Sequence, residues 1–365
     1  MADEAIDLSA EFGDIRQEEQ LDWARLQAFL RDKLPGAEKP LEVKQFRGGS
    51  SNLTYLLRFG DQEWVVRRPP FGPLPVGGHD MAREYKVLSR LWKVFKPAPR
   101  AMVFSDDISI IGAPFFVMER RHGLVIKQRQ PLPPEMPTDP ASLRRLSEGF
   151  IDAAADLHNV DYKAIDLDTL GRPEGFLNRQ TSGWMKRWEA AKTREVPLME
   201  KLGAWFLKHT PPAQPPAIIH NDFYLHNIMV DAKDPGIITG VFDWEMSTLG
   251  DPLVDIGIAL NYWRDKTDPE ELLLTSQGEV PTLRPGFLTR DELIARYGKR
   301  TGRDMSNIGY YWAWAHWKTA TVVEQIYVRY VRGQTTDPRF AQMGSFAPGL
   351  AHAAALVAKR EGFKE

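Results

Sequence analysis

The sequence contains no cysteine, and this absence excludes disulfide bonds, thiolate metal sites and cysteine nucleophiles together. Long apolar runs are also missing, so no segment approaches the length that crosses a bilayer. The acidic N-terminal stretch lacks the apolar segment of a secretory signal. Excess charge of either sign is absent too, because 47 Lys and Arg residues oppose 49 Asp and Glu residues. We therefore expect a cytoplasmic protein with neither a membrane nor a nucleic-acid partner.

Strand-type patterns dominate the first third of the chain. β-branched and aromatic residues recur over residues 41–47, 52–59 and 63–68, and again near 101–105 and 114–119. Residues 17–34 have the periodicity of an amphipathic helix, and Asp80 is placed to cap a second helix. We expect residues 1–119 to form an N-terminal lobe, built as a small antiparallel sheet with helices.

The pattern changes near residue 120. A proline-rich loop covers residues 131–140, and Asp139-Pro140 is typical of a helix start. Helical periodicity then predicts helices at 141–158, 180–209, 252–262, 290–301 and 308–332. The 365 residues are enough for two compact lobes. We expect an α+β fold of two lobes in which residues 120–365 form a larger, mainly helical C-terminal lobe.

The most informative segment begins with His220-x-Asp222 and continues with Asn227 and Asp243. This order and spacing match the phosphate-transfer centre of the protein-kinase-like fold. Phosphoryl transfer needs a carboxylate that accepts the proton of the attacking hydroxyl, and Asp222 is placed for that role. It also needs Mg²⁺, which prefers hard oxygen ligands such as Asn227 and Asp243. The segment therefore predicts ATP-dependent phosphorylation, with His220 supporting the loop.

A hairpin explains how two metal ligands can lie sixteen positions apart. The apolar run 228–230 and the β-type run 237–242 flank Asp234-Pro235-Gly236, which has the composition of a turn. Such a hairpin would bring the residues at its open end together. Further along, Asp251 and Asp255 are expected to brace the loop and the following helix.

ATP binding also requires a phosphate-covering loop and a cation from the first lobe. A glycine-rich segment between two predicted strands suits the loop, although a plain hairpin turn explains it equally well. The strand lysine of protein kinases is absent, and an arginine stands in its place; guanidinium forms forked hydrogen bonds with phosphate. Its expected ion-pair partner is a helix glutamate, and residues 115–119 are expected to border the adenine. The candidate nucleotide-binding residues are Gly48, Gly49, Ser50, Ser51, Asn52, Arg67, Glu84 and Glu119.

From about residue 46 to residue 332, the chain resembles the aminoglycoside phosphotransferase and choline kinase superfamily. The resemblance is carried by the motifs GGSSN, VVRRPP, EYKVL, HNDFYLHN, FDWE and GDPLVDIG. The first two are most similar to phosphotransferase domains associated with acyl-CoA dehydrogenases. The resemblance implies a protein-kinase-like fold, ATP, Mg²⁺ and a small hydroxylated acceptor. It also implies that Asp222 is catalytic, that Asn227 and Asp243 bind metal, and that Arg67 binds nucleotide.

The spacing after Asp243 favours a small acceptor, because Asp251 follows only eight positions later and leaves no room for a peptide-docking segment. Residues 310–332, the expected pocket helix, are aromatic and basic, which disfavours a polycation and permits a neutral or anionic substrate. The resemblance to domains associated with acyl-CoA dehydrogenases implies, within that range, a hydroxy acid or a hydroxyacyl thioester. Core packing remains an alternative explanation for these aromatic residues. A second interpretation of the whole chain, a nucleotide-binding scaffold or sensor without turnover, is also open. The sequence does not specify the oligomeric state.

Overall fold

The computed structural model describes residues 11–47, 52–72, 79–127, 130–268, 272, 279–335 and 338–364. The chain divides into two compact units. The first comprises residues 1–123, 163–170 and 239–247, and the second comprises residues 124–162, 171–238 and 248–365.

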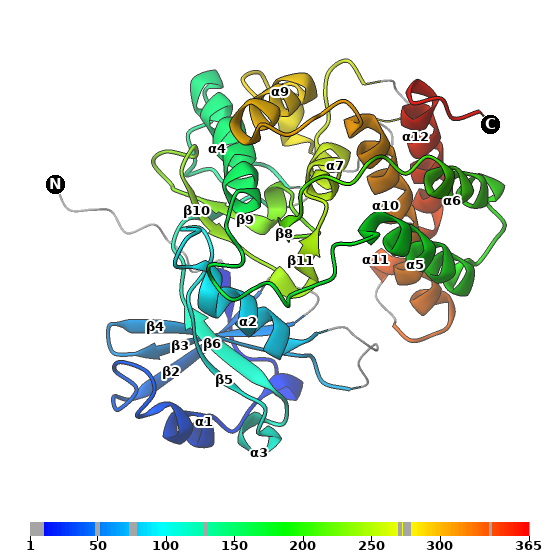
Figure 1. Cartoon of the computed structure of the whole chain (residues 1–365). Coiled ribbons are helices and arrows are strands. Elements are labelled where there is room, and N and C mark those ends of the chain that lie inside the picture. The colour runs from blue at the N-terminus through cyan, green and yellow to red at the C-terminus, as the bar shows by residue number, and fades with distance from the viewer. Residues whose placement is uncertain are drawn as a thin grey trace. The chain divides into compact units, whose positions relative to one another are not determined.

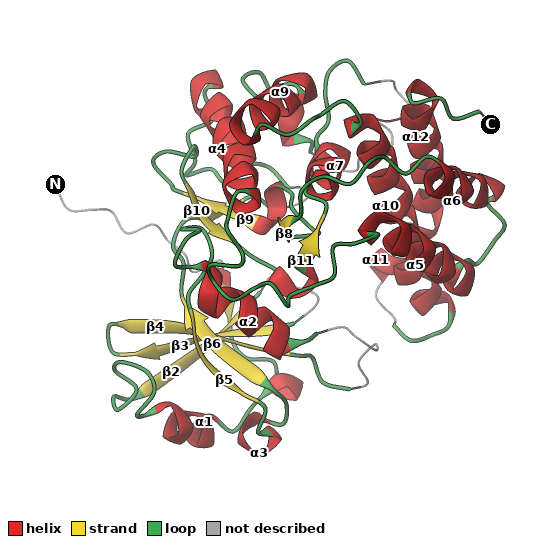
Figure 2. Ribbon diagram, in the orientation of Figure 1, coloured by secondary structure: helices red, strands yellow, loops and turns green. Residues whose placement is uncertain are grey.

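The first unit is built on a six-stranded antiparallel sheet with the order β1-β2-β3-β4-β6-β5, drawn in yellow in Figure 2. Its strands are β1 (Phe12–Gly13), β2 (Leu41–Phe46), β3 (Leu53–Phe59), β4 (Gln62–Arg68), β5 (Ala101–Ser105) and β6 (Phe115–Glu119). The register pairs Arg67 with Thr54 on one side and with Phe116 on the other. Arg67 therefore projects from a central strand whose backbone is held by both neighbours.

Short helices accompany this sheet, and Figure 1 shows α2 (Met81–Leu91) beside β5 and β6. As predicted, the Asp80 side chain caps α2 by accepting the Arg83 N–H. The prediction of one helix over residues 17–34 is wrong. A 3₁₀ turn, η2 (Gln17–Glu19), comes first, and α1 (Trp23–Leu30) begins only after Asp22, which caps it. A four-residue helix, α3 (Ile108–Ile111), completes the set.

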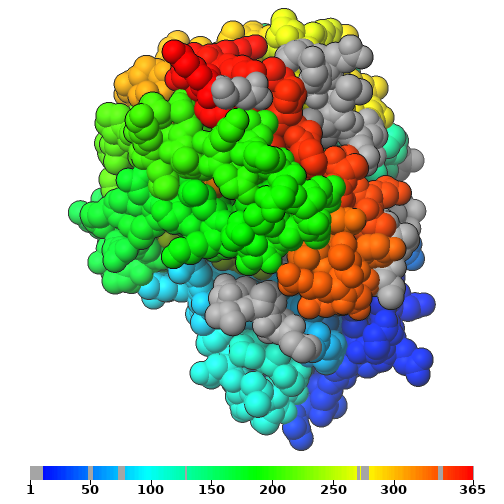
Figure 3. Space-filling model, turned by 90° about the vertical axis from the view of Figure 1, so that its right-hand side faces the viewer, coloured from blue at the N-terminus to red at the C-terminus, as the bar shows by residue number. Residues whose placement is uncertain are grey.

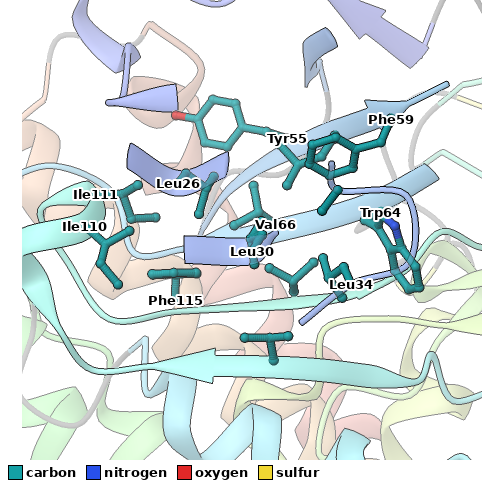
Figure 4. Packing of buried hydrophobic residues seen from close by; sticks show 14 of the residues in the cluster. Leu26, Leu30, Leu34, Tyr55, Phe59, Trp64, Val66, Ile110, Ile111 and Phe115 are labelled. Carbon is teal, nitrogen blue, oxygen red and sulfur yellow. The ribbon is translucent and has the colours of Figure 1, made fainter. Parts of the chain in front are cut away.

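Apolar side chains from α1, α3 and one face of the sheet form the core of the first unit (Figure 4). Leu26 and Leu30 point from α1 onto Tyr55, Phe59 and neighbouring sheet residues, and all of these are buried. Burial of large apolar side chains contributes roughly 1.5–3 kcal/mol each, so this cluster fixes the sheet that carries Arg67.

The second unit is mainly helical. Its helices are α4 (Pro140–His158), α5 (Phe176–Ala191), α6 (Pro197–Lys208), α7 (Leu253–Tyr262), α9 (Arg290–Thr301), α10 (Ile308–Val331), α11 (Pro338–Gln342) and α12 (Phe346–Arg360), with 3₁₀ turns η3 (Leu225–Asn227), η5 (Pro281–Leu283) and η6 (Met343–Ser345). The predicted helix 180–209 is in fact two helices, because the chain leaves the helix at Lys192 and restarts at Pro197. The α12 helix was not predicted. It packs along α10, as the orange and red atoms of Figure 3 show.

Short strands carry the loops between these helices. Strand β8 (Ala217–Ile219) pairs with β11 (Thr248–Gly250), and β9 (Ile228–Val230) pairs with β7 (Leu124–Val125). Strand β10 (Ile238–Val241) begins in the second unit and leads into the first, where η4 (Trp244–Met246) follows. An antiparallel sheet followed by a mainly helical portion confirms the predicted α+β class. Within the described ranges, no helix has both the length and the apolar composition that would let it cross a membrane.

Candidate active site

In the first unit, Arg67 joins the helix α2 to the segment that carries Asp243. Its guanidinium Nη1 lies 3.2 Å from Glu84 Oε1, and its Nη2 donates to Asp243 Oδ1 at 2.7 Å. The predicted ion pair between Arg67 and Glu84 is therefore present. Asp243 itself adopts a left-handed backbone conformation, with φ of 68°, which is uncommon for a residue other than glycine. Such conformations are frequent at active sites, where the surrounding structure enforces them.

Arg67 and the carboxylates beside it shift one another's pKa values. Burial works to lower the pKa of Arg67, but the carboxylates of Glu84 and Asp243 raise it above its usual value. Burial raises the pKa of Glu84 to about 7, and the negative charges of Asp243 and Glu245 act in the same direction against Arg67. Burial, followed by the charge of Asp243, also raises the pKa of Glu245. One buried cation is thus surrounded by three carboxylates, which makes this cluster a candidate functional site.

Glu245 and His79, which were not predicted as site residues, both contact Asn52 or each other in this cluster. The Asn52 side-chain amide donates to Glu245 Oε2 at 3.0 Å, and the Asn52 Oδ1 lies 2.8 Å from Nδ1 of His79. His79 Nδ1 also lies 3.8 Å from the same Glu245 oxygen. Asn52 is therefore held by the segment that carries Asp243. Glu245, in the Trp-Glu that follows Asp243, was a signal available in the sequence, whereas His79 was not distinguishable from any other loop histidine.

Four of the predicted nucleotide-binding residues, Gly48, Gly49, Ser50 and Ser51, lie outside the described residues. Glu119 ends β6, where its carboxylate accepts the Arg100 N–H at 2.9 Å and lies 3.2 Å from Arg121 Nε. Its side chain thus holds neighbouring backbone and an arginine. The assignment of all eight candidate residues to nucleotide binding, including Asn52, Arg67 and Glu84, stays a prediction.

In the second unit, the predicted catalytic loop brings Asp222 and Asn227 together. The Asn227 Nδ2 donates to the backbone carbonyl of Asp222 at 2.9 Å and to its Oδ2 at 3.1 Å. This contact is possible because η3 turns the chain immediately after Tyr224, whose carbonyl accepts the Asn227 N–H. The structure therefore groups the predicted metal and catalytic residues in two sets, with Asp222 and Asn227 in the second unit and Asp243 in the first.

A buried carboxylate holds the backbone just before Asp222. The two oxygens of Asp255, in the first turn of α7, accept the N–H groups of His220 and Asn221, each at 2.7 Å. His158 Nε2 lies 3.0 Å from the same carboxylate, and Tyr297 contacts the other ring nitrogen of His158. Burial works to raise the pKa of Asp255, but the hydrogen bond and the charge of His158 lower it below its usual value. Asp255 therefore braces the loop, as its sequence position suggested.

Asp251 accepts hydrogen bonds from α7 and from α10. Its Oδ1 accepts the Leu253 N–H at 3.0 Å and its Oδ2 accepts the Tyr311 hydroxyl at 2.7 Å. Burial is the main cause of its raised pKa. Asp251 thus fixes the start of α7 against α10.

The second unit also contains a cavity of about 230 Å³ beside the catalytic loop. Its wall includes Leu225 and His226 of η3, Ala259 and Asn261 of α7, and Val322 and Val323 of α10. Aromatic residues of α10, among them Trp314 and Trp317, are buried in the core, which is the alternative that the sequence left open for them. The sequence periodicity could not distinguish the face of α10 that lines the cavity from the face that packs into the core, because both faces are apolar.

The donor atoms of the predicted metal ligands fit Mg²⁺ chemically, since all are hard oxygens. The Asn227 amide makes its hydrogen bonds to Asp222 through Nδ2, and no described residue donates to its Oδ1. Asp243 uses Oδ1 for Arg67, and its side chain is 29% exposed. Each residue thus keeps a carbonyl or carboxylate oxygen for a ligand.

The fold is kinase-like, because an antiparallel sheet is followed by a mainly helical portion. Together with the Asp222–Asn227 loop, this fold defines a phosphotransferase. Residues 42–288 match the model of the phosphotransferase enzyme family, and the chain belongs to that family. It is a small-molecule phosphotransferase, that is, a kinase.

The relatives extend this assignment. The chain is 30% identical to acyl-CoA dehydrogenase family member 11 of Gallus gallus over 364 residues, which cover 96% of the chain but 45% of that protein. It is thus homologous to the phosphotransferase-like region of a relative more than twice as long. A crystal structure of a candidate aminoglycoside phosphotransferase from Ralstonia eutropha JMP134 has 28% identity and a TM-score of 0.80, covering 93% of this chain and 99% of that one.

A thermostable mutant of aminoglycoside phosphotransferase APH(4)-Ia, crystallised with ADP and hygromycin B, shares the fold with a TM-score of 0.55. Its identity is 14%, over 93% of this chain and 99% of that one. That protein binds ADP and hygromycin B.

Proposed function

We propose that the chain transfers the γ-phosphoryl group of Mg²⁺-bound ATP to a hydroxyl group of a small molecule, a hydroxy acid or a hydroxyacyl thioester. The observation that carries this proposal is the Asp222–Asn227 loop, in which a carboxylate and an amide are held together on a braced backbone. Because phosphoryl transfer depends on positioning more than on covalent chemistry, such a braced pair suits the reaction.

In this proposal, Asp222 accepts the proton of the acceptor hydroxyl. The hydroxyl oxygen forms a bond to the γ-phosphorus while the bond between that phosphorus and the leaving ADP oxygen breaks. Asn227 Oδ1 and the Asp243 carboxylate would hold Mg²⁺, which neutralises charge on the phosphate oxygens when it is bound. Arg67 would bind phosphate oxygens through its fork of N–H groups, with Glu84 orienting it. Asn52 and its glycine-rich neighbours would cover the phosphates.

The cavity in the second unit supports the acceptor class. Its volume of about 230 Å³ exceeds the roughly 150 Å³ of an apolar cavity that holds benzene, so a short aliphatic chain fits it. Among the described residues of its wall, the charged ones are Arg264 and Glu279, so this part of the wall carries no acidic excess for a polycation. Asn261 Oδ1 is buried and accepts no hydrogen bond from any described residue. It offers an acceptor for a hydroxyl or amide N–H of the substrate.

A coupled ADP-release screen tests the proposal. The panel contains straight-chain hydroxy acids and hydroxyacyl-CoA thioesters of four to twelve carbons, together with amino alcohols, sugars and aminoglycosides. We expect Mg²⁺-dependent turnover with an aliphatic hydroxy compound and a chain-length optimum. The variant V323F narrows the cavity and should move the optimum to shorter chains without a change in the KM for ATP.

Two results would contradict different parts of the proposal. Turnover confined to aminoglycosides would refute the acceptor class and keep the kinase assignment. Full activity after chelation of divalent cations would refute the role of Mg²⁺ and of its proposed ligands.

A further inference from the structure

A lysine of the second unit lies where lysines are rarely found. Lys318, in the middle of α10, is 6% exposed. Lysine is almost never buried to this degree unless its charge is compensated, because transfer of an ammonium group out of water is unfavourable. Its Nζ donates a hydrogen bond to the backbone carbonyl of Asn221 at 2.9 Å. The buried cation is therefore directed at the residue that precedes Asp222.

Asn221 needs such a restraint. Its backbone is left-handed, with φ of 68°, in a conformation that residues other than glycine rarely adopt. Asp255 accepts its N–H on one side, and Lys318 donates to its carbonyl on the other. That carbonyl belongs to the peptide bond between Asn221 and Asp222. The Asp255 contact thus fixes the peptide plane before Asn221, and the Lys318 contact fixes the peptide plane that leads to Asp222.

The charges that face Lys318 come from the loop, α7 and α5. Burial lowers the pKa of Lys318, the carboxylates of Asp222 and Asp255 act to raise it, and Arg187 acts to lower it. The ring of Trp184 lies 5.6 Å from the ammonium. Two carboxylates thus offset the unfavourable burial of this group, and one of them is the proposed proton acceptor.

We propose that Lys318 is a positioning residue for Asp222: through the Asn221 carbonyl, it locks the strained peptide that aims the Asp222 carboxylate at the acceptor hydroxyl. The inference rests on the proposed function for the meaning of that orientation, but the lock itself is a property of the loop. Lys318 lies 96 positions after Asp222 in the sequence, so no local motif indicates it. Because misplacement of a reacting group by about 1 Å costs on the order of 100-fold in rate, the lock should be visible in turnover.

The test compares K318M with T321V by steady-state kinetics and by amide hydrogen exchange. Methionine keeps the length of the side chain and removes the donor and the charge. Thr321 is the matched control, because it is fully buried on the same helix and, among the described residues, its hydroxyl donates to the Trp317 carbonyl of that helix alone. We expect K318M to lower kcat by roughly 10- to 100-fold with the KM for ATP within threefold, and to speed exchange in residues 219–224. T321V should leave both quantities near wild type.

A K318M enzyme with kcat within twofold of wild type, or with loop exchange equal to that of T321V, would overturn the inference. If K318M does not fold, K318R provides the test, because it keeps a cation and a donor with altered geometry. K318R should then retain more than a tenth of the wild-type protection from amide exchange in the loop, and its kcat should fall at least threefold. An unchanged kcat in K318R would overturn the inference. If wild type phosphorylates no acceptor, the proposed function fails, and the exchange comparison still decides whether Lys318 holds the loop.

Discussion

The buried carboxyl group of Glu84 gives a quantitative prediction for the first unit. Glu84 is 1% exposed and lies 3.2 Å from the Arg67 guanidinium, yet burial raises its pKa from 4.5 to about 7. In E84Q the side chain keeps its size and loses its ability to ionise. The effect of this substitution should therefore depend on pH in a direction that the geometry of the ion pair alone would not suggest.

The sign follows from proton binding. Between about pH 4.5 and pH 7 the folded chain holds a proton on Glu84 that the unfolded chain has released. The free energy of unfolding must then fall as pH rises through this window. The difference between the two pKa values corresponds to a loss of about 3 kcal/mol in the free energy of unfolding. This loss is absent below pH 4.5 and complete above pH 7. E84Q lacks this loss, so its stability relative to wild type should increase by that amount.

Thermal unfolding at pH 5 and pH 8 measures this difference. The Tm of E84Q relative to wild type should rise by roughly 4 °C between the two conditions, because an unfolding entropy of about 2.1 cal/mol/K per residue applies to 365 residues. E63Q is the matched control in the same unit: burial works to raise the pKa of Glu63, but hydrogen bonds from Arg58 and Arg120 hold it below its usual value. Its stabilising contribution is therefore constant from pH 5 to pH 8 and is lost only at lower pH. A relative Tm of E84Q that changes by less than about 1 °C, or falls at pH 8, would show that folded Glu84 does not hold its proton in this range.

Two further substitutions test the second unit. A Cβ at Gly257 would lie 2.4 Å from the Tyr311 carbonyl oxygen, so G257A should separate α7 from α10 and destabilise the unit by about 1–3 kcal/mol. In contrast, among the described residues the new Cβ of G183A meets the Arg187 side chain alone, at 3.8 Å, so this variant should be neutral or stabilising by up to about 1 kcal/mol. Equal Tm values for the two variants would contradict this. D255N turns an amide toward the buried N–H groups of the loop, and the lost hydrogen bond should destabilise the loop by about 1–3 kcal/mol. Unchanged amide exchange at residues 220 and 221 in D255N would show that Asp255 does not brace them.

Much of this architecture could be predicted because its signals are local. Asp139 before Pro140 and Asp80 before α2 are helix starts that the sequence states directly, and both cap their helices. Strand boundaries agreed to within a residue or two, since alternating apolar side chains mark them. The break between α5 and α6 was missed because amphipathic periodicity continues across it, although Pro197 marks the restart.

The site was predictable only in part, because its contacts join distant segments. Spacing alone identified Asp222 and Asn227, which lie five positions apart. The contact of Arg67 with Asp243 spans 176 positions, and no local pattern reports it. Lys318 was grouped with the basic residues of a pocket helix, whereas the structure buries it under the catalytic loop.

In the proposed mechanism, Asp222 accepts the proton of a small-molecule hydroxyl during phosphoryl transfer. The most direct test is the comparison of wild type with D222N on the acceptor found by the ADP-release screen, with the phosphorylated product followed by ³¹P NMR. We predict a decrease of 10²- to 10⁴-fold in kcat for D222N, with the KM for ATP within threefold of wild type. A D222N enzyme whose kcat is within twofold of wild type would contradict the account.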